Sequence, residues 1–118
     1  MTKPERRELD TKTLALAAMR CRAGAPRLSA DELAAHVATL PGWTSAGDRL
    51  VKEYAFANYH ETMAFVNALA WIAHREDHHP DMLVSWGECR VSYVTHAIDG
   101  LSENDFICAA KLDALFDL

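Results

Sequence analysis

The chain has 118 residues, a length typical of one domain, and its balance of 50% hydrophobic and 25% charged residues is ordinary for a globular protein. A formal net charge of −5 argues against a nucleic-acid partner, because binding to phosphates requires clustered Lys and Arg. No apolar run approaches the ~20 residues of a membrane span, and the charged N-terminus lacks the apolar core of a secretory signal, so we expect a cytoplasmic protein with no membrane partner.

Residues 1–27 are expected to form an N-terminal extension ahead of a domain at residues 28–118. The extension contains the pattern of a short amphipathic helix that ends at the breaker run of residues 24–26. Its apolar members are Leu9, Leu14, Leu16 and Met19.

The domain is predicted to open with a helix and a hairpin. Ser29 and Glu32 form a capping box that starts the helix, and Pro41 stops it. Residues 43–44 and 50–56 read as two strands joined by the turn-like residues 45–49.

A central helix is predicted next. Asn58 and Glu61 form an N-cap pair, and apolar residues follow at helical spacing through residue 73. Because Pro80 cannot continue a helix, this one must end near residues 77–79 and carry His78 and His79 at its C-terminal end.

A second hairpin is predicted from residues 82–86 and 89–95, with Gly87 in the first loop position of a type II′ turn. Alternation along its second strand places Arg90, Ser92 and Val94 on one face, and His96 continues that face at the strand end.

A last helix is predicted from Ser102 as its cap, with Asp105 at the third position and Leu101 opposite Phe106. The order is α-β-β-α-β-β-α. It predicts an α+β fold, in which a four-stranded antiparallel sheet has helices packed on one face.

Histidines, an aromatic residue and an acid recur at fixed spacings in residues 74–105. Three residues separate the first polar position from a His-His-Pro triplet, five lead to the aromatic residue, nine to the third histidine and eight to the acid. These positions are His74, His78-His79-Pro80, Trp86, His96 and Asp105. The pattern resembles the signature of the pterin-4a-carbinolamine dehydratase family, and the resemblance covers about residues 21–116.

The resemblance implies the dehydration of 4a-hydroxytetrahydropterin to quinonoid dihydropterin, a step of pterin recycling. The pterin is the substrate, and no cofactor is required. Imidazole suits the reaction, because a pKa of about 6.5 lets it give or take a proton near neutrality. By resemblance His78 and His96 are the acid/base pair, and His79 and Asp77 bind the pterin or shape its pocket.

Other residues are expected to line or support this site. Trp43 and Trp86 are candidates for the substrate pocket, as its wall or as core beneath it. Asp105 supports the histidines electrostatically or acts only as a capping-box carboxylate. His74 departs from the Glu that the family commonly has there, and an imidazole cannot polarise its neighbour as an anion would.

A metal site formed by His74, His78 and His96 is the alternative to acid/base chemistry. His74 and His78 are four residues apart and would lie on one face of a helix, with His96 as a third ligand. The HExxH pattern is absent, because Glu76 stands at the third position, and we expect no metal. Cys21, Cys89 and Cys108 are odd in number and lack CxxC spacing, which favours reduced thiols, and we interpret Cys89 and Cys108 as small buried apolar residues.

A function of another class stays open. By resemblance, some dehydratase-like proteins bind other proteins, for example as Rubisco assembly factors of the α-carboxysome, and such a role would make the protein carboxysome-associated. The partners expected on the two readings are a pterin-dependent hydroxylase or Rubisco. A homodimer or homotetramer is expected on both, because an open sheet leaves an edge that pairing would satisfy.

Overall fold

A computed structural model describes residues 11–116, and the expected Leu9 lies outside them. The helices are α1 (Thr11–Ala17), α2 (Ala30–Ala38), α3 (Tyr59–Glu76) and α4 (Glu103–Phe116). The strands are β1 (Thr44–Ala46), β2 (Arg49–Ala55), β3 (Asp81–Val84) and β4 (Glu88–Tyr93), and a 3-10 helix, η1 (His96–Ile98), follows β4. The α+β prediction is confirmed, with the order α-α-β-β-α-β-β-α.

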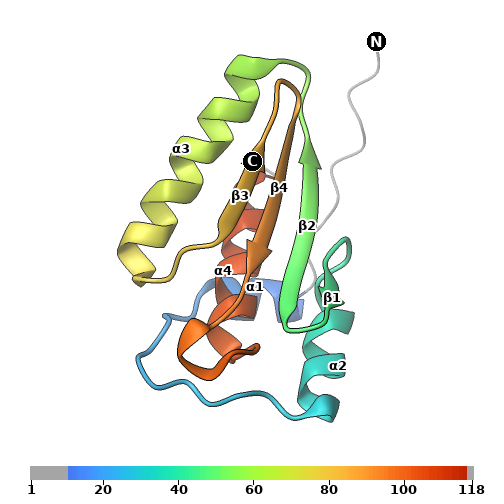
Figure 1. Ribbon diagram of the computed structural model, residues 1–118, viewed down its shortest axis with the longest axis vertical. Helices are drawn as coiled ribbons and strands as arrows, with labels where there is room; N and C mark the ends of the chain where they lie inside the picture. The colour runs from blue at the N-terminus through green and yellow to red at the C-terminus, as the bar shows by residue number, and fades with distance from the viewer. Residues whose placement is uncertain (1–10, 117–118) are drawn as a thin grey trace.

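The sheet is antiparallel throughout, with the strand order β1-β2-β4-β3. The helices α3 and α4 pack against each other on one of its faces (Figure 1). Alternate residues of the central strands point to these helices, so Tyr54 of β2 and Val91 and Tyr93 of β4 are buried. They meet Phe106 and Ile107 of α4 in the core.

The caps read from the sequence form as predicted. The Ser29 hydroxyl accepts a hydrogen bond from the backbone N–H of Glu32 at 3.2 Å, and the Glu32 carboxylate accepts one from the Ser29 N–H at 3.0 Å. Asn58 caps α3 by accepting the N–H of Glu61 at 2.9 Å. Asp77 ends α3 in the left-handed conformation, with φ 51°.

The prediction of a type II′ turn at Gly87 is wrong. A type II′ turn needs positive φ at its first central residue, and Gly87 has no positive φ. The loop consists of Trp86 and Gly87, since Ser85 donates to the Glu88 carbonyl at 2.9 Å. Glycine is favoured for a different reason: a Cβ at residue 87 would lie 3.1 Å from the carbonyl oxygen of Phe56, a tight contact.

The apolar face predicted for α1 is also partly wrong. Leu16 is buried as expected, but Leu14 is 51% exposed and Met19 lies beyond the helix end. Thr13 takes the place of Leu14, because its hydroxyl donates to the Thr39 carbonyl and orients α1 with that face inward. None of the helices in the described range 11–116 is long and apolar enough to cross a membrane.

Glu76 ties the segment after α1 to the end of α3. Its carboxylate accepts a hydrogen bond from the Cys21 N–H at 2.7 Å and one from the Arg20 guanidinium at 2.8 Å. Burial opposes ionisation of Glu76. The Cys21 hydrogen bond and the charges of Lys111 and Arg20 outweigh burial and hold the pKa of Glu76 below its ordinary value.

A second buried carboxylate, Asp113, ties α4 to the sheet. It accepts hydrogen bonds from the Trp43 indole at 3.1 Å, the Lys52 ammonium at 2.8 Å and the Tyr54 hydroxyl at 2.7 Å. Trp43 precedes β1 rather than lying in it, and only 3% of its surface is exposed. This tryptophan is therefore a core residue.

Candidate active site

The site is built where α3 ends against the first turn of α4. The left-handed conformation of Asp77 turns the chain, so that the N–H groups of Asp77 and His78 both donate to the Ala73 carbonyl. This turn directs the His78 ring inward. Its Nε2 lies 2.7 Å from Oδ1 of Asp105, whose side chain is fully buried.

Asp105 combines the two roles weighed for it. Its second oxygen, Oδ2, accepts the Ser102 N–H at 2.9 Å, which is the capping-box bond, and the Thr95 hydroxyl at 2.7 Å. The Ser102 and Thr95 hydroxyls are 2.8 Å apart. The carboxylate that caps α4 is thus the same group that contacts His78.

This geometry fixes how His78 presents its two nitrogens. A carboxylate is an acceptor, so the Nε2 that faces Asp105 carries a hydrogen. Among the described residues, no hydrogen bond engages Nδ1 of His78. Nδ1 is therefore the nitrogen left for proton exchange with a ligand.

The ring of Tyr93 packs against the ring of His78. The two rings are stacked, with centroids 5.9 Å apart and an interplanar angle of 7°. Burial, followed by the nearby Cys108 and Cys21 thiols and the Asp105 carboxylate, raises the pKa of Tyr93 well above its ordinary value. Its hydroxyl has no hydrogen-bond partner in the described part of the chain, so the ring supports His78 while the phenol stays neutral.

His96 lies in η1 and not at the end of a strand, which corrects the strand prediction. β4 ends at Tyr93, because Thr95 instead pairs with Gly100 and closes a tight loop. The Arg27 guanidinium donates to the carbonyls of Ile98 and Asp99 and holds this loop from outside.

The fixed loop places His96 next in the chain to Thr95, whose hydroxyl bonds the carboxylate that His78 also contacts. His96 is exposed and comes directly after Thr95, which bonds Oδ2 of Asp105, while His78 bonds Oδ1. The two predicted acid/base residues are thus linked to one buried acid in different ways: His78 bonds Asp105 directly, and His96 is the chain neighbour of Thr95, which bonds it. Of the other predicted site residues, Asp77 and His79 are adjacent to His78 in the chain and exposed.

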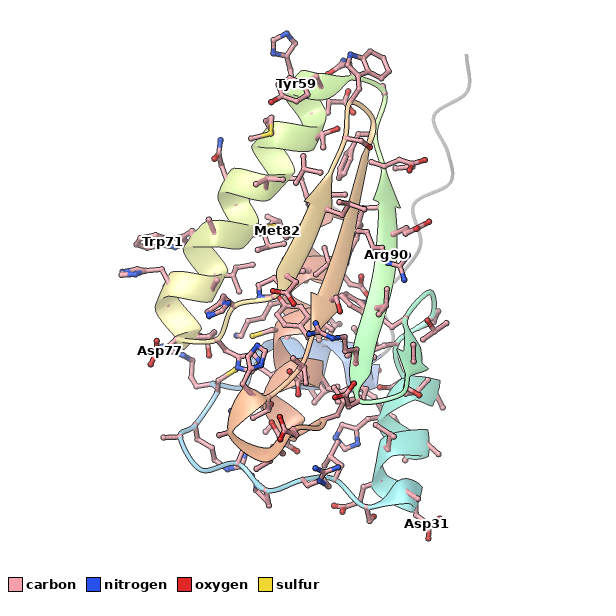
Figure 2. All side chains as sticks on the ribbon, in the orientation of Figure 1. Asp31, Tyr59, Trp71, Asp77, Met82 and Arg90 are labelled. Atoms are coloured by element: carbon pink, nitrogen blue, oxygen red, sulfur yellow. The ribbon has the colours of Figure 1, made fainter. Side chains whose placement is uncertain are left out.

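Three predicted site residues lie apart from this group. His74 is exposed, and its ring packs 5.6 Å from that of Trp71, which projects from the outer side of α3 (Figure 2). Trp86 is 66% exposed in the β3–β4 turn, where its carbonyl accepts the Thr62 hydroxyl at the start of α3. From residue 62 to residue 76 the helix rises about 21 Å, so Trp86 is far from His78 of its own chain. Trp43 lies in the core, as described above.

Metal coordination gains no support from the arrangement. Within residues 11–116, no group of three or more His, Cys, Asp or Glu side chains could hold a metal ion. His74, His78 and His96 therefore do not assemble into the alternative zinc site. The described site offers a carboxylate-oriented imidazole and a second, exposed imidazole, which suit proton transfer.

The sequence interpretation missed Tyr93, Thr95 and Arg27. Alternation gave a signal for Tyr93, since it shares the inward face of β4 with Cys89 and Val91. Thr95 could have been suspected as a polar side chain between a buried strand and His96. Arg27 contacts a loop 71 residues away, and no local pattern indicates such a contact.

Comparisons with a family model and with known proteins point to one and the same protein family. The family model described as pterin 4 alpha carbinolamine dehydratase matches residues 26–115. A Nitrosospira multiformis protein named as a pterin-4-alpha-carbinolamine dehydratase is 56% identical over 98 residues, which cover 83% of this chain and 87% of the relative. A Chromobacterium violaceum protein of the same name is 62% identical over 80 residues, covering 68% and 74%.

Two solved structures are also similar. The transcriptional coactivator/pterin dehydratase from Brucella melitensis superimposes with a TM-score of 0.74 at 25% identity, covering 76% of this chain and 98% of that one. A pterin dehydratase-like protein identified as a RuBisCO assembly factor in the α-carboxysome superimposes with a TM-score of 0.53 at 27% identity, covering 62% and 84%.

Proposed function

Because the chain belongs to the pterin-4a-carbinolamine dehydratase family, we propose that it is a hydro-lyase that converts 4a-hydroxytetrahydropterin to quinonoid dihydropterin and water. The observation that carries the proposal is the His78–Asp105 hydrogen bond, with His96 next in the chain to Thr95, which bonds the same carboxylate. All three residues lie within the matched residues 26–115.

The chemistry divides into two proton transfers. The C4a hydroxyl leaves as water after it accepts a proton, and the N5 hydrogen departs as a proton while its electron pair forms the new C=N bond. One imidazole therefore acts as the acid and one as the base. His78 exchanges its proton at Nδ1, because Asp105 holds its other nitrogen. His96, in η1, carries out the other of the two proton transfers.

The remaining site residues take lesser roles in this proposal. His79 and Asp77, exposed beside His78, contact the pterin ring. Trp43 acts from the core, since its ring centroid is 6.0 Å from that of Tyr93, which in turn supports His78. His74 lies against Trp71 on the outer side of α3 and contributes at most indirectly.

The test is the dehydration rate of freshly generated 4a-hydroxytetrahydropterin with wild type, His78→Ala, His96→Ala and the double variant. Each single substitution should lower the rate by about 10² or more, the usual scale for loss of a general acid or base. His60→Ala is the matched control, because His60 is an exposed histidine at the opposite end of α3 and should leave the rate unchanged. Wild-type turnover by the double variant would refute the assignment.

A second candidate function is assembly of a protein partner. It is supported by the similarity to the RuBisCO assembly factor and by His74 in place of the common Glu. The 27% identity to that protein is well below the 56% identity to the relatives named as dehydratases, so we favour the enzyme. A folded protein that does not accelerate dehydration but captures Rubisco subunits in a pull-down would reverse this preference.

We also propose that the chain forms a homodimer or homotetramer through β3. This strand is an edge of the sheet and all four of its residues are exposed, including Leu83 at 71%. Apolar exposed edges favour pairing with a second strand. Leu83→Lys should convert the oligomer to a monomer in light scattering, whereas Glu53→Lys, on the exposed surface of the internal strand β2, should not.

A further inference from the structure

Two cysteines that are far apart in the sequence meet beneath the candidate site. The Sγ atoms of Cys21 and Cys108 are 3.5 Å apart, across 87 residues of chain. We propose that these two thiols form an intramolecular disulfide when a peroxide oxidises the protein. The site is distinct from the dehydration chemistry, because neither sulfur is among the proposed acid/base groups.

The backbone holds Cys21 in place from both sides. Its own N–H donates to Glu76 at 2.7 Å, and the N–H of Arg22 donates to Oδ1 of Asn104 at 3.0 Å. The Asn104 amide returns a hydrogen bond to the Arg22 carbonyl at 2.8 Å. Cys21 therefore cannot swing away from α4 without breaking three hydrogen bonds.

Cys108 lies on the side of α4 that faces Cys21. Asn104 and Cys108 are four residues apart and lie on one side of the helix. The Cys21 thiol lies 3.6 Å from the Asn104 carbonyl as well as 3.5 Å from Cys108. An S–S bond measures about 2.05 Å, so closure requires the two sulfurs to approach by about 1.5 Å.

The two thiols differ in accessibility. Cys21 is half-buried and Cys108 is fully buried. The hydrogen bond with Cys21, followed by burial, raises the pKa of Cys108. Cys21 is therefore the sulfur that meets the oxidant, and Cys108 is the resolving thiol.

The oxidation proceeds in two balanced steps. The Cys21 thiolate attacks one oxygen of hydrogen peroxide, the O–O bond breaks, and sulfenic acid and hydroxide form. The Cys108 sulfur then attacks the Cys21 sulfur, the S–O bond breaks, and water leaves with the Cys108 proton. The two thiols together lose two electrons and the peroxide gains them.

The experiment treats the full-length protein with hydrogen peroxide, alkylates the remaining thiols and digests it with a glutamyl endopeptidase. We expect a cross-linked pair of peptides that contain Cys21 and Cys108, while Cys89 is alkylated. Because the bond closes a loop of about 90 residues, the unfolding temperature should rise on the order of 10 °C and return to its starting value with dithiothreitol.

Two variants distinguish disulfide formation between Cys21 and Cys108 from oxidation of the accessible Cys21 alone. Cys89→Ala should form the same cross-link, whereas Cys108→Ala should let Cys21 proceed to sulfinic acid, since no resolving thiol remains. The proposal is overturned if wild type shows sulfinic acid at Cys21 with Cys108 alkylated, or disulfides only between two chains. The wild-type digest decides the question even if Cys108→Ala does not fold.

Discussion

Replacement of Asp105 by asparagine tests the link between the α4 cap and the proposed chemistry. The carboxylate serves His78 through Oδ1 and serves Thr95 and Ser102 through Oδ2. Asparagine has only one acceptor oxygen. When that oxygen faces Thr95 and Ser102, its NH₂ group faces Nε2 of His78, which must then give up its hydrogen.

The expected loss follows from the bond that is removed. A hydrogen bond to a charged group contributes about 1.5–3 kcal/mol. At about 1.36 kcal/mol per tenfold change, its loss lowers kcat/KM by about 10- to 150-fold if it acts in the transition state. The proton also moves to Nδ1, so the nitrogen assigned to proton exchange has the wrong tautomer.

The assay is the dehydration rate across pH for wild type, Asp105→Asn and Asp113→Asn. Asp113 is the matched control, because it is a buried carboxylate of the same helix that also accepts three hydrogen bonds, from Trp43, Lys52 and Tyr54. Both variants should lose unfolding free energy in urea. Only Asp105→Asn should lower the rate of the folded enzyme and displace the inflection of its pH–rate profile.

Two results would refute this reasoning. One is an Asp105→Asn enzyme that is folded and keeps the wild-type rate and pH profile. The other is an equal loss of rate in folded Asp113→Asn, which would mean that the position of α4, and not the His78 contact, controls turnover.

Three further substitutions test the framework. Glu76→Gln should remove a pH dependence of stability. The depressed pKa of Glu76 stabilises the fold above the unfolded-state value of about 4.3, and wild type should lose this advantage over the variant in urea unfolding as the pH falls below that value and through the lower folded-state pKa. Gly87→Ala should cost about 1–3 kcal/mol in the same assay, because its methyl group meets the Phe56 carbonyl, and an unchanged midpoint would contradict this. Trp43→Phe should cost about 1–3 kcal/mol by removing a donor to Asp113 and leave KM unchanged, whereas a raised KM would place Trp43 in contact with the pterin.

Signals carried by neighbouring residues predicted the element order well. The cap pairs at Ser29 and Asn58 each act within one helical turn, so four consecutive residues of the sequence are enough to predict each cap. The end of α3 before Pro80 was predicted for the same reason. These local rules, with the alternation of β2 and β4, were enough for the fold class.

Long-range contacts account for what the sequence could not predict. Gly87 looked like a turn residue, but its small size is favoured by the close Phe56 carbonyl, 31 positions earlier in the chain. Trp43 and Trp86 looked alike as candidate pocket aromatics, and only the distant Asp113 distinguishes the buried one. The His78–Asp105 contact spans 27 residues, and its indication came from the family resemblance and not from periodicity.

The two carboxylates of α4 also limit how this chain can change in length. One inserted or deleted residue between Asp105 and Asp113 would rotate one end of the helix by about 100° relative to the other, so at least one carboxylate would lose its partners. The β1–β2 turn holds no comparable set of partners, because Gly47 is exposed and a Cβ there would meet no atom within 4 Å, so its φ of 65°, which favours glycine, is the one local constraint. Peptide tags or reporter loops should therefore be accepted at Gly47, while the spacing of α4 must be kept.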